Sequence, residues 1–317
     1  MASAQSIILH QYEGSPFAEK VRLALRLKNL AWSKVDIPPV MPKPDLMPLT
    51  GGYRRTPVLQ IGADIYCDTA LILRHLEARF PDNALVTAGQ EGTHCMISSW
   101  TDKQWFQTSV GIVFGANIDR LPDALKKDRE AMTGRDFSPE GMKARLPMLK
   151  DQWRAQLSWL EERLEAGRGA GSGQWLFGAH PGMSDVHAHM NIWFVLKNVP
   201  DFAKTCLQET PRVQDWFDRI SESKGQEPET LTGEEALKLA REASPRLLAA
   251  SAGTEPQGLR PGERIAITPD DMVPNWVTGE LVSAHPNKLT LYKVDGAIET
   301  LHIHFPRAGY LVKRVED

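Results

Sequence analysis

The stretch Tyr12-Glu13-Gly14-Ser15-Pro16-Phe17 joins a short apolar run to a helical pattern and decides the fold of this chain. The apolar run, residues 6–10 (SIILH), is typical of a buried strand, and Gly14 ends it. Serine at an N-cap followed by proline at the first helical position is a strong start signal for a helix, and Ser15-Pro16 supplies both. The sequence therefore predicts a strand, a sharp turn and a helix that begins at Ser15.

The pattern beyond this helix continues to alternate between strand and helix signals. Residues 30–37 form a second apolar run, and a proline-rich loop then leads to residues 55–61 (RTPVLQI). A two-residue turn separates that segment from residues 64–67, and an amphipathic helix follows Asp68-Thr69. The order strand, helix, strand, hairpin and helix predicts an α/β thioredoxin-like domain over residues 1–82.

Three short motifs mark this domain: Ser15-Pro16-Phe17 with Lys20-Val21-Arg22, then Thr56-Pro57-Val58-Leu59, then Asp68-Thr69-Ala70-Leu71-Ile72. Together they resemble the glutathione-binding domain of cytosolic glutathione S-transferases, in a serine-type, bacterial-like form. The resemblance is dense over the first quarter of the chain and looser to about residue 222. Each motif alone is weak, and the combination is specific.

Composition narrows the class of protein further. A chain of 317 residues suits two or three domains, and a net charge of −3 argues against a nucleic-acid or anionic-membrane surface. Its three cysteines show no metal spacing and fit a reducing compartment. The first residues lack the features of a signal peptide, and no apolar run is long enough to cross a bilayer. We therefore expect a cytoplasmic protein without a membrane or nucleic-acid partner.

Residues 81–92 are polar and are typical of a linker. Beyond them the apolar residues recur at helical spacing, which predicts an all-helical second domain over residues 93–245. The helical patterns occupy residues 93–115, 139–165, 182–196, 212–221 and 233–243. Where the resembled family often has Ser or Thr as the cap of a buried helix, this chain has Gly182, with Asp185 three residues on. Asp185 can reach back to the backbone N–H of the cap residue, which predicts a role in folding rather than catalysis.

After a linker rich in Ala, Ser, Gly and Pro at residues 244–262, the sequence changes from a helical to a strand pattern. Five short apolar segments separated by turn residues predict strands at 264–268, 276–283, 288–294, 299–305 and 310–315. We interpret residues 263–317 as a small β-barrel-like module, which the resembled family does not normally carry. Because so small a domain is marginal alone, we expect it to pack on the helical domain or on a partner subunit.

Ser15 is the candidate catalytic residue. A thiol with a pKa of about 8.5 is mostly protonated at neutral pH, and the thiolate is the nucleophile. A hydroxyl at a helix N-terminus can donate to the sulfur while the helix end favours the anion. Tyr12 is the rival hydroxyl, and a plain N-cap is the alternative role for Ser15. No cysteine stands at this helix start, which argues against disulfide exchange.

The resemblance also implies which residues would hold glutathione. Thr56 would present its backbone to the cysteinyl part through a cis bond to Pro57, and Asp68-Thr69 would bind the γ-glutamyl end. Arg55 and Lys43 are candidates for the glycyl carboxylate. The alternatives are structural: Pro57 could simply start a strand, and Asp68 could be an ordinary N-cap.

Trp100, Trp105 and Phe106 are candidates, with Tyr12, for the wall of a pocket that binds the second substrate. Aromatic residues at helical spacing equally suit a core. His302 and His304 lie on one face of a predicted strand, but no third ligand is at hand, and we expect no metal.

The sequence thus predicts a glutathione transferase that activates the glutathione thiol for attack on a small hydrophobic electrophile, with a homodimer implied by the resemblance. One alternative is a non-catalytic glutathione-binding or scaffolding protein that uses the C-terminal module. The other is a glutathione-dependent peroxidase or reductase.

Overall fold

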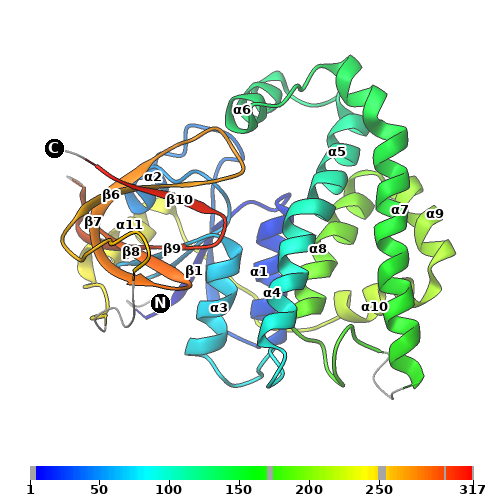
Figure 1. The fold of residues 1–317 in the computed structure, drawn as a ribbon, viewed down its shortest axis with the longest axis horizontal. Helices are drawn as coiled ribbons and strands as arrows, with labels where there is room; N and C mark the ends of the chain where they lie inside the picture. Colours follow the sequence, from blue (N-terminus) through cyan, green and yellow to red (C-terminus); the bar gives the residue numbers. More distant parts are fainter. Residues whose placement is uncertain (1–4, 170–173, 249–254, 296–297, 316–317) are drawn as a thin grey trace.

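The computed structural model describes residues 5–169, 174–248, 255–295 and 298–315. Its N-terminal part is the predicted thioredoxin-like domain, in which β1 (Ile7–Gln11) pairs in parallel with β2 (Trp32–Asp36) and antiparallel with β3 (Val58–Ile61). β3 forms a hairpin with β4 (Asp64–Cys67). The helices of this domain are α1 (Pro16–Leu27), α2 (Met47–Thr50) and α3 (Thr69–Arg79). α1 and α3 lie between the sheet and the helical domain (Figure 1).

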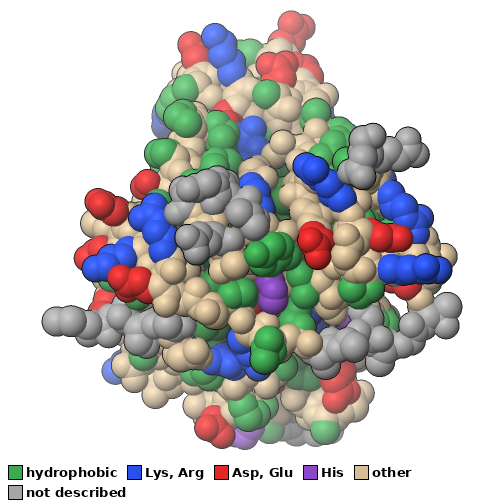
Figure 2. Space-filling view, turned by 90° about the vertical axis from the view of Figure 1, so that its left-hand side faces the viewer, with side chains coloured by type: hydrophobic (Ala, Val, Ile, Leu, Met, Phe, Trp, Pro, Cys, Tyr) green, Lys and Arg blue, Asp and Glu red, His purple; other side chains and the backbone are tan. Residues whose placement is uncertain are grey.

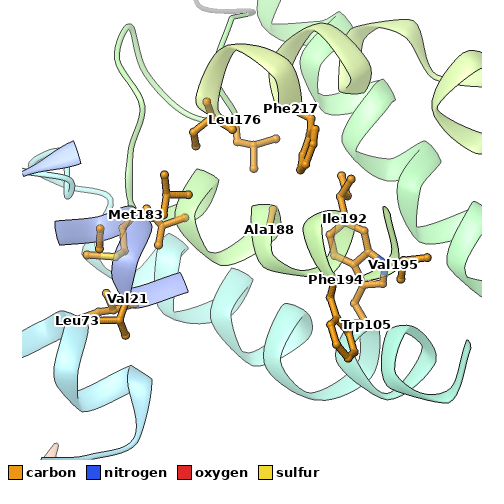
Figure 3. Close-up of a cluster of buried hydrophobic side chains, with 14 of the residues drawn as sticks. Val21, Leu73, Trp105, Leu176, Met183, Ala188, Ile192, Phe194, Val195 and Phe217 are labelled. Carbon is orange, nitrogen blue, oxygen red and sulfur yellow. The ribbon is translucent and has the colours of Figure 1, made fainter. Parts of the chain in front are cut away.

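The helical domain follows, and most of it packs around one central helix. Its elements are α4 (Glu91–Ser99), the π-helix η1 (Trp100–Trp105), α5 (Phe106–Asn117), α6 (Asp123–Thr133), α7 (Pro139–Gly169), α8 (Met183–Asn198), α9 (Pro200–Glu209) and α10 (Pro211–Ser221). α8 is buried along most of its length, as its apolar sequence predicts. In Figure 3, Met183 of α8 lies beside Val21 of α1 and Leu73 of α3, so one core joins the two domains.

Asp185 holds the start of α8 as predicted. One carboxylate oxygen accepts from the backbone N–H of Gly182 at 2.8 Å. The other accepts from the backbone N–H of Leu176 at 2.9 Å and from Trp216 Nε1 at 2.7 Å. The carboxylate therefore ties together the cap of α8, the loop before it and α10.

The segment after α10 returns to the sheet instead of staying in the helical domain. β5 (Glu229–Thr230) pairs in parallel with β2. α11 (Gly233–Glu242), which we expected in the helical domain, buries its apolar face in a second core cluster between the strands and α2. Figure 1 shows α11 among the strands, away from α7 and α9.

All five predicted C-terminal strands are present, close to their predicted bounds. They are β6 (Arg264–Pro269), β7 (Val277–His285), β8 (Lys288–Asp295), β9 (Ile298–Pro306) and β10 (Tyr310–Arg314). They pair antiparallel in the order β10-β6-β7-β8-β9. The space-filling view of this side of the molecule shows acidic and basic side chains interspersed with hydrophobic ones (Figure 2).

β9 pairs in parallel with β4, and this pairing corrects the expected position of the strand module. Ile303 lies opposite Ile65, and His302 and His304 lie opposite Asp64 and Tyr66. Among the described residues the strands therefore form one ten-stranded sheet, with β4 and β9 at the junction. The main packing partner of the module is the N-terminal domain, because an unpaired edge of β4 is completed by β9. Among the described residues, no helix has the length and apolar character to span a membrane.

Candidate functional site

Ser15 lies at the end of the turn after β1 and caps α1, as its sequence position predicts. Its Oγ accepts from the backbone N–H of Ala18 at 3.1 Å, and the residue is 2% exposed. Because a hydroxyl can accept and donate at the same time, the cap uses an oxygen lone pair and leaves the hydroxyl proton available to another acceptor. Capping and thiol activation are therefore chemically compatible at this residue.

Tyr12 is linked to the helical domain rather than to the cap. Its backbone carbonyl accepts from the N–H of Ser15 at 3.0 Å, which closes the turn. Its hydroxyl accepts from Arg129 Nη2 on α6 at 3.4 Å, and the same guanidinium donates to the carbonyl of Pro39 at 3.0 Å. Tyr12 thus lies where the first turn of the N-terminal domain meets α6.

Buried Lys43 and half-buried Thr56 form a polar group beside β3. The Thr56–Pro57 bond is cis, as the resemblance implied. Lys43 Nζ donates to the carbonyl of Arg54 at 2.9 Å and to Thr56 Oγ1 at 3.0 Å. Burial lowers the pKa of Lys43 to about 8, with further contributions from Arg129 and Arg54. Since both hydrogen bonds go to uncharged oxygens, this ammonium is suited to a ligand carboxylate.

Asp68 and Thr69 begin α3, and Asp68 has a contact that the sequence pattern did not predict. Its Oδ1 accepts from the backbone N–H of Ala70 at 2.9 Å, so it is an N-cap with a positive φ of 76°. Its Oδ2 accepts from the hydroxyl of Tyr310 at 3.1 Å, and that hydroxyl also lies 3.2 Å from the hydroxyl of Tyr53. Thr69 is buried beside it. The strand module therefore reaches one end of the candidate site.

Arg55 is engaged by the same module at a second point. Its Nη2 forms an ion pair with Asp271, and its Nε donates to Met272 Sδ at 3.1 Å. Both partners belong to the loop between β6 and β7. No local signal could have predicted these contacts, because more than two hundred residues separate the partners in sequence.

α6 covers the neighbouring loops of the N-terminal domain. Asp128 forms ion pairs with Arg54 and Arg129, and its Oδ1 accepts from the backbone N–H of Met41 at 3.1 Å. This helix was not assigned in the sequence, where residues 116–138 had no predicted element. Arg129 of this helix therefore contacts Tyr12, and the guanidinium groups of Arg129 and Arg54 both lie close enough to Lys43 to lower its pKa.

The three candidate aromatic residues lie in two different environments. Trp105 is fully buried, stacks on Trp100 at a ring distance of 5.0 Å and belongs to the helical core, which matches the structural alternative. Trp100 also donates through Nε1 to Gln156 at 2.8 Å. Phe106, by contrast, packs edge-to-face on Phe17 of α1 at 4.6 Å. Of the three, Phe106 is the one in contact with the first turn after Ser15.

An ion pair between buried Lys20 and half-buried Asp102 fixes α1 against the helical domain. Lys20 Nζ lies 2.6 Å from both carboxylate oxygens of Asp102 in η1, and Ser98 Oγ donates to the same carboxylate at 3.1 Å. Burial raises the pKa of Asp102, and the Lys20 ammonium opposes that shift. Lys20 therefore holds the helix that carries Ser15, and its position in the sequence motif has a structural reason.

The paired histidines of β9 lie at the junction of the sheet. His304 Nε2 donates to Asp64 Oδ1 at 2.8 Å, and its Nδ1 lies 2.9 Å from Thr290 Oγ1. Both ring nitrogens of His304 are thus paired with protein groups. In the part of the chain that the structure describes, no group of three or more potential metal ligands is found.

Comparison with known proteins gives one match to the N-terminal domain and one to almost the whole chain. The family model described as "Glutathione S-transferase, N-terminal domain" matches residues 9–84. The crystal structure of a GST-like protein from Pseudomonas syringae is 35% identical and superposes with a TM-score of 0.80, over 98% of this chain and 100% of that chain. At that coverage the similarity extends through the C-terminal strands.

More distant structures share the fold alone. A glutathione S-transferase from Rhodospirillum rubrum F11 is 18% identical, with a TM-score of 0.54, over 68% of this chain and 88% of its own. The β-etherase LigF from Sphingobium sp. strain SYK-6 is 17% identical, with a TM-score of 0.51, over 68% and 95%. Among curated proteins, none matches this chain.

Proposed function

The chain belongs to the glutathione S-transferase family, and from this premise we propose that it binds glutathione and activates its thiol at Ser15 for attack on a small hydrophobic electrophile. The observation that carries the proposal is the N-cap of α1. Ser15 Oγ accepts from Ala18, so its proton remains to stabilise a thiolate near the positive end of the helix. Lowering a thiol pKa by one unit needs only about 1.4 kcal/mol.

The remaining site residues fit the tripeptide by their chemistry. The ammonium of Lys43 and the guanidinium of Arg55 suit carboxylates, and the Asp68-Thr69 cap of α3 suits the γ-glutamyl end. Phe106 and Tyr12 would line the side from which the electrophile approaches. We further propose that the protein is cytoplasmic and a homodimer. Light scattering on the purified chain would test the homodimer, and cell fractionation would test the location.

Replacing Ser15 with Ala tests the proposal. A hydrogen bond to a charged sulfur is worth about 1.5–3 kcal/mol, so we expect turnover to fall about ten- to hundredfold while glutathione affinity changes little. The substrate panel comprises an aryl halide, an aryl ether, an isomerisable substrate and a hydroperoxide, because the reaction could be substitution, ether cleavage, isomerisation or reduction.

Thr232→Ala is the matched control, since Thr232 caps α11 in the same way, accepting from the backbone N–H of Glu235 at 3.2 Å. It removes a cap of similar energy, about 1 kcal/mol, and should leave turnover unchanged. If Ser15→Ala leaves turnover unchanged and Tyr12→Phe lowers it, Tyr12 is the activating group and the assignment of Ser15 is wrong.

A second candidate function has its own support. Ser15 is nearly fully buried, and Arg55 and Asp68 are both engaged by the strand module, which favours a glutathione-binding or scaffolding protein without turnover. That function predicts that glutathione raises the Tm while no electrophile on the panel is consumed. Turnover that depends on Ser15 would exclude it.

A further inference from the structure

The loop between β6 and β7, residues 270–276, spans from the N-terminal domain to the helical domain, and we name it the bridging loop. Asn275 Nδ2 donates to the carbonyl of Gly52 at 2.8 Å. The backbone N–H of Val273 donates to the carbonyl of Met132, the penultimate residue of α6, at 3.1 Å. Asp270 lies 3.7 Å from Lys103. Figure 1 shows this loop extending from β6 and β7 toward α6.

Within the bridging loop, Asp271 and Met272 occupy one edge of the Arg55 guanidinium. Asp271 forms the ion pair with Nη2, and Met272 Sδ accepts from Nε at 3.1 Å. Nε and Nη2 together form an edge with which an arginine can bind a carboxylate through two parallel hydrogen bonds. A protein carboxylate therefore stands where Arg55 could otherwise receive a ligand carboxylate.

The position of Asp271 is set by the sheet. Tyr310 of β10 lies directly opposite Pro269, the last residue of β6, so the bridging loop begins beside the residue that contacts Asp68. β7, at the other end of the loop, pairs with both β6 and β8. Strand pairing therefore holds both ends of the loop, and the sheet fixes where Asp271 meets Arg55.

We propose that Asp271 is a specificity-determining residue of the glutathione site, an internal carboxylate that competes with one carboxylate of the tripeptide for Arg55. This inference rests on the proposed function. A ligand must displace Asp271 to use Arg55, so its apparent affinity is reduced by the fraction of molecules in which Arg55 is already paired. The penalty falls on ligands with a carboxylate at that position and spares ligands with an amide there.

The test compares Asp271→Asn with the wild-type chain by titration calorimetry on the full-length protein. The ligands are glutathione and two derivatives, each with one of its two carboxylates converted to the amide. The side chains of the pair are 24% exposed for Arg55 and 40% exposed for Asp271, so its strength is that of a partly screened ion pair. We expect glutathione to bind Asp271→Asn about three- to tenfold more tightly, and one of the two amides to show no such gain.

Two further variants make the result specific. Asp270→Asn removes the same charge from the same loop, but Asp270 pairs with Lys103, and it should not change glutathione affinity. In an Arg55→Gln background the gain from Asp271→Asn should disappear, because no guanidinium remains to compete for.

No gain in Asp271→Asn, or an equal gain for glutathione and both amides, would overturn the role of Asp271 while leaving the proposed function standing. If neither chain binds glutathione or its amides at all, the proposed function fails, and the role of Asp271 fails with it.

Discussion

At the scale of single residues, Asp185 is the side chain with the clearest structural role. Its carboxylate accepts from two backbone N–H groups and from the indole of Trp216; the bonds from Leu176 and Trp216 are buried and that from Gly182 is half-buried. Burial raises the pKa of Asp185 to about 6, and these three donors oppose the shift. The cost of burying the carboxylate is therefore offset by hydrogen bonds that fix α8 and α10.

We predict that Asp185→Ala lowers the free energy of unfolding by about 3 kcal/mol, because it leaves two buried donors and one half-buried donor without an acceptor. Urea unfolding would measure the change. Asp215→Ala, at an exposed position on α10, is the control and should change it by less than about 0.5 kcal/mol. A loss of similar size in both variants would contradict this role for Asp185.

The residues that sequence could identify are those whose signal is local. Ser15 and Asp185 each have a capping partner three residues away, so capping rules predicted these two hydrogen bonds. The bonds from Leu176 and Trp216 to Asp185 come from residues farther away in sequence and were not predicted. The partners of Arg55 and Asp68 are Asp271 and Tyr310, and only the folded sheet brings them together. Their contacts were therefore outside the reach of motif spacing.

At the scale of elements, the junction between β4 and β9 depends on a buried polar chain. Asp64 accepts from His304 Nε2 through one oxygen and from the backbone N–H of Arg246 through the other, at 2.9 Å. Burial acts to raise the pKa of Asp64, but these donors, His304 foremost, hold it below its ordinary value. Since His304 donates through Nε2, its Nδ1 accepts from the hydroxyl of Thr290.

Thr290→Val should destabilise this junction. It keeps the shape of the side chain but leaves His304 Nδ1 buried without a donor, so we expect the free energy of unfolding to fall by about 1–3 kcal/mol. Chemical denaturation would detect the loss. Thr278→Val on β7, a half-buried position, is the matched control; an equal effect there would show that the polar chain at β4 and β9 contributes nothing.

The strands themselves were predictable, but their arrangement was not. Apolar segments with turn residues between them defined β6 to β10 nearly to the residue. That β9 would pair with β4, and that α11 would pack on the sheet, depends on contacts between distant segments. Sequence periodicity describes which face of a strand is buried and carries no information on which edge it meets.

At the scale of the whole molecule, buried histidines make stability depend on pH, and His10, His189 and His304 are three of them. Burial lowers the pKa of His10 and His304 to about 4 and that of His189 to about 3. In the unfolded chain these histidines take up protons near pH 6.5, whereas in the folded protein they stay neutral to much lower pH. Their contribution to stability is therefore complete above about pH 6.5 and is lost as the pH falls toward 4.

We expect the free energy of unfolding to decrease between pH 7 and pH 5, by about 1 kcal/mol per histidine per pH unit below 6.5. The carboxyls of Asp102 and Asp185, whose pKa values burial raises, act in the opposite direction, but the buried histidines outnumber them. Urea titrations at several pH values would give the slope. His189→Gln should reduce this slope by the amount that corresponds to about one bound proton. His285→Gln, at an exposed position on β7, should leave the slope unchanged. A protein equally stable at pH 5 and pH 7 would refute the argument.

The most direct test of thiol activation is the pKa of the glutathione thiol in the complex, followed by the ultraviolet absorbance of the thiolate during a pH titration. With the wild-type chain we expect a pKa at least about one unit below the ordinary thiol value of about 8.5, and in Ser15→Ala a return most of the way to that value. A bound thiol that titrates as it does in water, or one whose lowered pKa survives the loss of the Ser15 hydroxyl, would contradict the account.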